Sequence, residues 1–168
     1  IGKNISHGTF IKLYEYEMTG LKSPIILDLY NRLSILMPYI ALPIRLFERR
    51  KGYSANSYEA ILSGLSVRLE EDRSNNLEEE FTPPPTSKIS IMGQTMRLSF
   101  FVFKRDKSKN YRTNEGVIFN INGQTHGFLP KSFFCRQDVK MGYLTDSLLV
   151  VVDCSELSGR SREDLFMN

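Results

Sequence analysis

The chain has 168 residues, of which 41% are hydrophobic and 24% charged, so it can bury a core as one large or two small domains. A net charge of +3 is too small to indicate nucleic-acid binding by itself. No apolar run reaches membrane length and no secretory leader is visible, so we expect a cytoplasmic protein without membrane contact.

The two cysteines argue against a zinc site. Cys135 and Cys154 lack the spacing of paired metal ligands and have no neighbouring His or Cys. We expect two free thiols in a reducing compartment.

In the first fifty residues the pattern predicts a strand, a helix and a second strand. β-Branched and aromatic residues indicate a strand over 10–17. Apolar residues at helical spacing predict an amphipathic helix over 25–37, which Pro38 ends. A second strand is expected over 40–47.

The middle of the chain changes from helical to extended character. Leucine spacing favours a helix near 56–66, and the proline-rich run at 82–86 is typical of a stiff linker. The segment 89–95 is expected to be a strand or a bent strand pair. The β-prone run 96–104 predicts a strand covered on both faces.

The last third contains the predicted centre of the sheet. A strand over 116–122 is expected to pair with 96–104 as a hairpin, and helix signals follow at 128–137. The continuous apolar run 148–153 is typical of a central buried strand, and 158–164 is expected to be a polar, mobile tail. Together the elements predict an α+β domain with a mixed sheet and a crossover helix.

The segment 120–128 is the most distinctive, because an apolar strand there meets small and polar residues. A strand that opens through glycine into a helix leaves backbone N–H groups free for a ligand. His126 fits a structural, hydrogen-bonded residue better than a general base, since neither a partner nor a substrate position is visible. For Gln124 and Thr125 the alternatives are capping of the next helix and docking against a partner domain.

A basic loop over 105–115 supports a separate hypothesis of nucleic-acid binding. Its cations could contact phosphates, and Tyr111 among them could stack on a base of a single strand. The alternative is a hairpin loop kept soluble by its charge. The candidate contacts are Lys104, Arg105, Lys107, Lys109 and Arg112.

Four stretches, taken in order, resemble the ATPases that comprise gyrase B, the heat-shock chaperone of that group, histidine kinases and MutL-type proteins (GHKL-type ATPases). Gly8-Thr9 resembles the last box of the ATP-binding domain, and 29–49 is similar to the helix and strand that close it. The segments 123–128 and 142–152 resemble the transducer domain that follows, with two residues fewer between His126 and Gly127.

The resemblance implies three regions and a coupling function. Residues 1–51 would end an ATP-binding domain, 52–87 would form a helix and linker, and 88–168 would form a transducer-like domain. ATP closes the upstream domain in such proteins, and the transducer turns a downstream domain or brings two subunits together. The implied partners are the upstream ATP-binding domain and a second copy of the chain in a homodimer. DNA is a further possible partner, which the separate hypothesis on the basic loop adds.

The resemblance also has departures. The Asn and Asp-x-Gly-x-Gly boxes that hold Mg²⁺ and adenine would precede residue 1, so we expect a fragment that does not bind ATP well alone. The family's Gln-Thr-Lys loop after strand 148–153 is missing. Arg160 and Arg162 stand there instead as candidates to contact the phosphate, with Lys131 as a further candidate. Gly8, Thr9, Gln124 and Thr125 are the implied docking residues between nucleotide domain and transducer.

Overall fold

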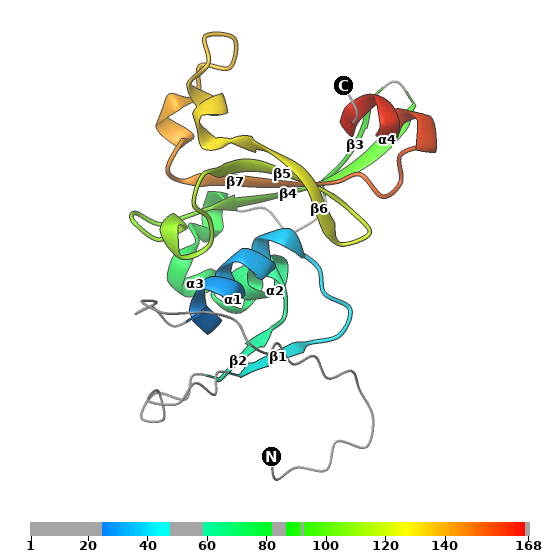
Figure 1. Cartoon of the computed structure of the whole chain (residues 1–168). Coiled ribbons are helices and arrows are strands. Elements are labelled where there is room, and N and C mark those ends of the chain that lie inside the picture. Colours follow the sequence, from blue (N-terminus) through cyan, green and yellow to red (C-terminus); the bar gives the residue numbers. More distant parts are fainter. Residues whose placement is uncertain (1–24, 48–58, 82–86, 92, 167–168) are drawn as a thin grey trace.

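The computed structural model describes residues 25–47, 59–81, 87–91 and 93–166 (Figure 1). Gly8, Thr9, the strand predicted over 10–17 and the linker predicted at 82–86 lie outside these residues. The amphipathic segment forms α1 (Ile25–Leu36), which confirms the predicted helix. α1 contacts an antiparallel hairpin of β1 (Ile44–Phe47) and β2 (Glu59–Leu62). β1 is the second half of the strand predicted over 40–47.

The helix predicted near 56–66 is wrong, because a glycine divides that segment into two elements. β2 ends at Leu62, and α2 (Leu65–Glu71) begins after Gly64, whose φ is +91°. The leucines that suggested one helix are all buried, but Leu62 reaches the core from a strand while Leu65 and Leu69 reach it from α2. A short α3 (Arg73–Asn76) follows.

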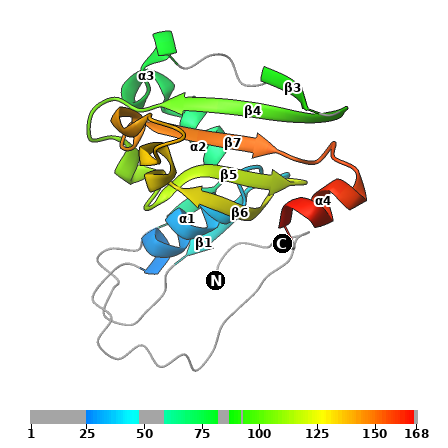
Figure 2. The same cartoon turned by 90° about the horizontal axis from the view of Figure 1, so that it is seen from above.

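A mixed five-stranded sheet organises the rest of the chain, as the α+β prediction expected. Its strand order is β3-β4-β7-β5-β6, and β5 and β7 are its only parallel neighbours (Figure 2). The continuous apolar run forms β7 in the centre of the sheet, which confirms that prediction. The strands are β3 (Ser87–Ile91), β4 (Gln94–Val102), β5 (Glu115–Ile121), β6 (Gln124–Pro130) and β7 (Leu148–Asp153).

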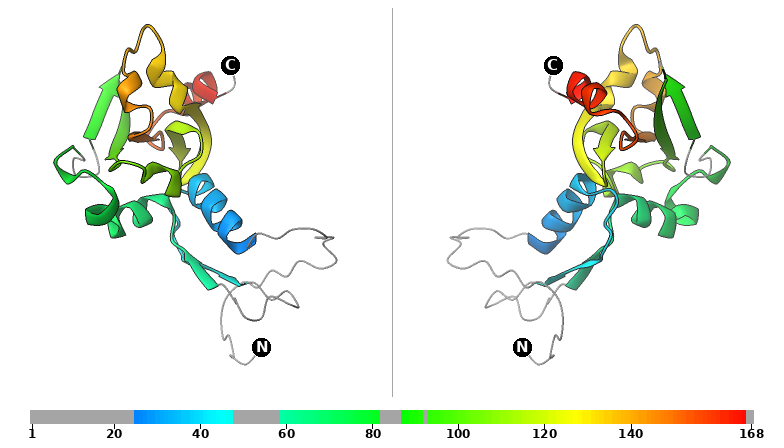
Figure 3. Two further views of the ribbon diagram at one scale, coloured as in Figure 1. Left: turned by 90° about the vertical axis from the view of Figure 1, so that its left-hand side faces the viewer. Right: turned by 90° about the vertical axis from the view of Figure 1, so that its right-hand side faces the viewer.

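Each face of the sheet packs its own apolar cluster. Leu149 and Val151 of β7 lie on the face covered by α1 and α2, together with Ile35 and Leu65. Val150 and Val152 point the other way, toward Phe134 and Leu157. Alternation along one strand therefore supplies both clusters, and the β1–β2 hairpin extends away from the sheet beyond the helices (Figure 3).

The hairpin predicted between 96–104 and 116–122 is wrong. β7 lies between β4 and β5 and pairs with both, so these two strands are not neighbours. The physical reason is that β7 is apolar on both faces and gains most from the central position, which is buried on both sides.

The helix predicted at 128–137 is also wrong, and so is the idea of a strand opening into a helix there. Asn122 and Gly123 have φ of 52° and 81° and form a tight turn from β5 into β6. Positive φ at two successive residues is the requirement of a type I′ hairpin turn, for which Asn-Gly is the preferred pair. After β6 the chain makes two 3₁₀ turns, Lys131–Cys135 and Gly142–Leu144, so no α-helix makes the crossover from β5 to β7.

The polar tail forms a helix, α4 (Gly159–Phe166). Ser158 explains where it begins, because its Oγ accepts a hydrogen bond from the N–H of Ser161 at 3.2 Å. This is the usual capping contact at a helix start.

The backbone that follows α1 is held between two glycines of left-handed conformation. A Cβ on Gly64 would lie 2.6 Å from the Pro38 carbonyl oxygen, and one on Gly123 would lie 2.5 Å from that of Tyr39. The N–H of Ser66 donates to the Pro38 oxygen at 3.0 Å. Residues 37–39 therefore join the start of α2 to the β5–β6 turn, a contact that we call the joint.

Gly123→Ala should lower the free energy of unfolding far more than Gly93→Ala. Both glycines have positive φ, of 81° and 76°, but a Cβ on Gly93 meets nothing within 4 Å. The left-handed backbone alone costs about 1–2 kcal/mol, and the clash at Gly123 should add a further 1–3 kcal/mol or so. Urea unfolding of both variants measures the difference, and equal losses would show that the joint is not tightly packed.

Candidate functional site

A row of polar side chains crosses four strands of the sheet on the face that carries the helices. The strand registers pair Arg97 with Asp153, Asp153 with Asn120, and Asn120 with Thr125. Paired residues of neighbouring strands point to the same face and lie about 5 Å apart at their Cβ atoms. We call these four side chains the polar row. The apolar cluster on the same face of the sheet ends beside them, with Ile118 of β5 and Val151 of β7.

The two charged members of the polar row have partners in the loop that follows β7. Arg97 forms an ion pair with Glu156, which lowers the pKa of that carboxyl group below its usual value. Asp153 accepts a hydrogen bond from the N–H of Ser155 at 2.9 Å. The loop after β7 is thereby fixed against this end of the sheet.

A depression of about 340 Å³ opens at this end of the sheet. That size is at the lower end of the range for small-molecule pockets. Its wall combines one cation, one carboxylate and several polar groups with an aromatic ring from the joint. The lining residues are Tyr39, Arg97, Ser99, Asn122, Gly123, Asp153 and Ser155.

Asn120 differs from its neighbours in the polar row because its side chain has no hydrogen-bond partner. The residue is fully buried, and neither its amide nitrogen nor its amide oxygen is paired. Buried polar groups are paired in the great majority of native structures, so such an exception requires an explanation. Sequence reasoning missed this residue, since its burial depends on how three strands are paired.

Thr125 contacts the end of α1. Its hydroxyl donates to the Ile35 carbonyl oxygen at 2.6 Å. Capping of a following helix is not its role, because β6 is a strand. Gln124 lies exposed at the start of the same strand, opposite Ile121. His126 is an extra, exposed residue between the pairs Asn120–Thr125 and Phe119–Gly127, which makes a β-bulge.

The predicted phosphate-contacting cations have different surroundings. Arg160 is exposed in the first turn of α4. Arg162 turns back onto the loop after β7 and donates to the carbonyl oxygens of Leu157 at 3.0 Å and Ser155 at 2.5 Å. Lys131 follows β6 and pairs with Asp146 at 2.7 Å, an interaction that lowers the pKa of Asp146. Arg160 is therefore the cation of this set on which the structure shows no competing contact.

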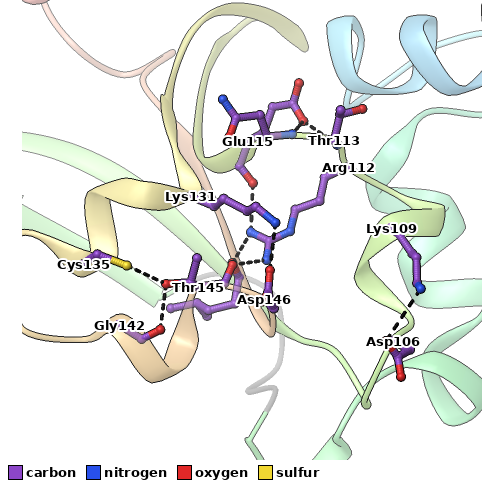
Figure 4. A network of polar contacts seen from close by, with 12 residues as sticks. Asp106, Lys109, Arg112, Thr113, Glu115, Lys131, Cys135, Gly142, Thr145 and Asp146 are labelled. Atoms are coloured by element: carbon purple, nitrogen blue, oxygen red, sulfur yellow. Dashed lines mark hydrogen bonds and ion pairs between the residues drawn. The ribbon is translucent and has the colours of Figure 1, made fainter.

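Arg112, one of the predicted nucleic-acid contacts, is buried and bonded inside the protein. Its guanidinium donates to the carbonyl oxygens of Glu115, Leu148 and Thr145 at 2.5–2.8 Å (Figure 4). Burial lowers its pKa. The Glu115 carboxylate accepts from two backbone N–H groups of the same loop. Arg112 thus ties the loop to the start of β7 and does not belong to the exposed basic surface, which corrects that part of the prediction.

Tyr111 is buried too, so its ring is not available to stack on a base. It stacks on Phe103 with ring centroids 5.4 Å apart, and its hydroxyl donates to Asp72 at 2.7 Å. Desolvation and the neighbouring carboxylate both raise its pKa. The basic loop on the surface therefore consists of Lys104, Arg105, Lys107 and Lys109, with Lys109 only 3.6 Å from Asp106.

Comparison with known proteins found no matching family model, curated protein or solved structure. Among the described residues, no cluster of three or more His, Cys, Asp or Glu side chains is placed to hold a metal ion. None of the helices that the structure describes is long and apolar enough to cross a membrane. Both cysteines are free, with Cys135 exposed and Cys154 buried, and burial raises the pKa of Cys154 to about 11.

Arg112→Ala should destabilise the protein by about 3 kcal/mol or more, because three carbonyl groups, one buried and two partly buried, lose their donor. Arg105→Ala is the matched control, since its side chain is 97% exposed and should change stability by less than about 0.5 kcal/mol. Thermal or urea unfolding gives both values. Similar small effects at the two positions would mean that Arg112 is not the buried link described above.

Proposed function

We propose that this chain belongs to a GHKL-type ATPase and couples ATP binding and hydrolysis in an upstream domain to a conformational change or to dimerisation. Residues 1–51 would end the ATP-binding domain, and residues 88–168, with the five-stranded sheet as their core, would form the transducer-like domain. The upstream Asn and Asp-x-Gly-x-Gly boxes would hold ATP and Mg²⁺, and the parent protein would work in the cytoplasm.

One observation carries the proposal, a continuous path of contacts from the loop after β7 to the end of α1. The N–H of Cys154 donates to the Asn120 carbonyl oxygen, and the N–H of Asn122 donates to the Ser155 hydroxyl, both at 2.8 Å. Gly123 of the β5–β6 turn packs closely against the backbone of Tyr39 at the joint. The loop is where the resemblance puts the phosphate sensor, so its displacement would reach the ATP-domain end of the chain through this turn.

An exposed apolar surface on α1 and the β1–β2 hairpin supports the same proposal. Large apolar side chains of α1 and of the β1–β2 hairpin, and of the segment between them, remain open to solvent. Leu36 is 52% exposed, Leu42 78% and Ile61 58%. A two-stranded hairpin is marginal alone and usually needs further strands or a covering element. The rest of an ATP-binding domain would supply that cover.

The chemistry assigned to this chain is limited to electrostatic contact. A bound ATP–Mg²⁺ would supply the scissile phosphoanhydride, while Arg160 would stabilise charge on the transferring group. Arg162 would position the loop through its two carbonyl contacts, so it acts as a positioning residue.

Arg160→Ala in the full-length gene product should lower the ATPase kcat about tenfold or more, because a positioned arginine is lost. Arg136→Ala is the control, since this exposed arginine lies on a different loop from Arg160, where it pairs with Asp138 and lies over the Phe133 ring. Steady-state phosphate release measures both. Unchanged rates for Arg160→Ala and Arg162→Ala would refute the assigned roles, and a gene product without the upstream boxes would refute the whole proposal.

A nucleic-acid-binding module is the second candidate function. The observation in its favour is that the basic loop is anchored on the helices at its first residue. The Lys104 backbone N–H donates to Asn76 O at 2.9 Å, and its ammonium group donates to Ser74 O at 2.7 Å. Against it, Glu70 and Glu71 lie on the adjoining α2 and reduce the local positive charge.

DNA binding by this loop should weaken steeply with salt and should fall further in Arg105→Glu. Mobility shifts over a salt series would measure both effects, with Arg136→Glu as a control for net charge. Weak binding without salt dependence would exclude this candidate.

A further inference from the structure

The unpaired amide of Asn120 lies in the layer between the sheet and α1. Thr125 is its direct neighbour on β6 and bonds to Ile35, so the two side chains face the end of α1. Ile118, two residues earlier on β5 and on the same face, belongs to the cluster that contains Ile35. Asn120 therefore presents two donors and an acceptor toward a helix end without using them in this structure.

The last turn of α1 offers groups that match this amide. The final four carbonyl oxygens of a helix have no partner within the helix. In α1 the Leu33 oxygen accepts from Met37, and the Ile35 oxygen is taken by Thr125. The N–H₂ group of Asn120, next to Thr125, can donate a hydrogen bond to one of these carbonyl oxygens.

The start of α2, which bonds to the joint, carries a second unpaired group. The hydroxyl of Ser66, in the first turn of α2, is buried and has no hydrogen-bond partner. The hydrogen bonds of the joint and its surroundings differ in length. Ser66 N–H donates to the Pro38 oxygen at 3.0 Å, whereas the Tyr39 N–H reaches the Gly123 oxygen only at 3.5 Å. Two unsatisfied buried groups around one joint require an explanation, and a second arrangement of the helices that pairs one of them would supply it.

We propose that α1 has a second position on the sheet, in which the Asn120 amide donates to a carbonyl oxygen of the last turn of α1 in place of the Thr125 hydroxyl. The two arrangements differ in which side chain of the sheet, Thr125 or Asn120, bonds to the last turn of α1. The second position itself is independent of any ATPase activity. Its role rests on the proposed function, in which the position of α1 would report the nucleotide state of the upstream domain.

NMR relaxation dispersion on the chain tests the inference directly. The Asn120 side-chain amide and the last turn of α1 should show exchange on the μs–ms timescale. Asn120→Leu keeps the side-chain size but removes the donor, so it should abolish the exchange. Thr125→Val removes the competing hydroxyl and should raise the population of the second position about fivefold, as expected for one lost hydrogen bond.

Two results would overturn the inference. One is the absence of exchange at Asn120 in the natural chain. The other is a lower urea midpoint for Asn120→Leu, because this would show that a buried water satisfies the amide in a single state. If exchange behaves as expected but Asn120→Leu leaves the ATPase rate of the full-length protein unchanged, the second position stands and the coupling role in the proposed function fails.

Discussion

The close packing of the residues after α1 between two left-handed glycines is the constraint on which the rest of the structure depends. Gly64 and Gly123 belong to different parts of the chain, yet each lies so close to this backbone that no side chain fits. The Ser66 N–H fixes the start of α2 on the same residues, and the Thr125 hydroxyl fixes the end of α1 on β6. The layer of α1 and α2 thus receives its place on the sheet from backbone contacts at one point, while the apolar cluster beneath supplies most of the free energy.

The parallel pairing of β5 and β7 brings the candidate functional residues to one end of the sheet, where both strands terminate. Both strands end on the same side, so the turn after β5 and the loop after β7 lie next to each other and share hydrogen bonds. The polar row lies close to this end of the sheet, at Asp153 of β7 and Asn120 of β5, where the apolar cluster stops. Since β6 and β4 flank this pair, Thr125 and Arg97 complete the row from both sides. A strand order without this parallel pair would place these residues at opposite ends.

Local patterns were enough to predict α1, the apolar strand β7 and the α+β class, because spacing of apolar residues directly reflects burial. The β5–β6 turn was readable as well, since Asn122-Gly123 is a strong hairpin signal, although the sequence analysis predicts a strand that opens into a helix there. The insertion of β7 between β4 and β5 was not readable, because it depends on contacts between distant segments. The same holds for Arg112 and Tyr111, whose charge and ring suggested a surface role. Their partners are Leu148 in β7, Thr145 in the loop before β7 and Asp72 directly after α2, and only the folded chain brings these together.

The location of the unpaired polar groups is what connects the fold to the proposed coupling function. Burying the Asn120 amide without a partner costs stability, and a leucine of the same size would fill the space without that cost. If such unpaired side chains had no role, we would expect to find them anywhere in the core. Instead, within the described part of the chain, the buried side chains without a partner belong to Asn120, on the sheet face that α1 covers, and to Ser66, at the start of α2. Asn120 lies two residues before Asn122, a residue of the turn that contacts both the loop after β7 and the joint. An element that must shift in response to a distant ligand needs an interface that is not fully satisfied in one position, because a fully satisfied interface would hold it there. The polar row thus lies where the proposed movement of α1 needs a contact that can change, while the apolar cluster on the other face of the sheet contains no residue of α1.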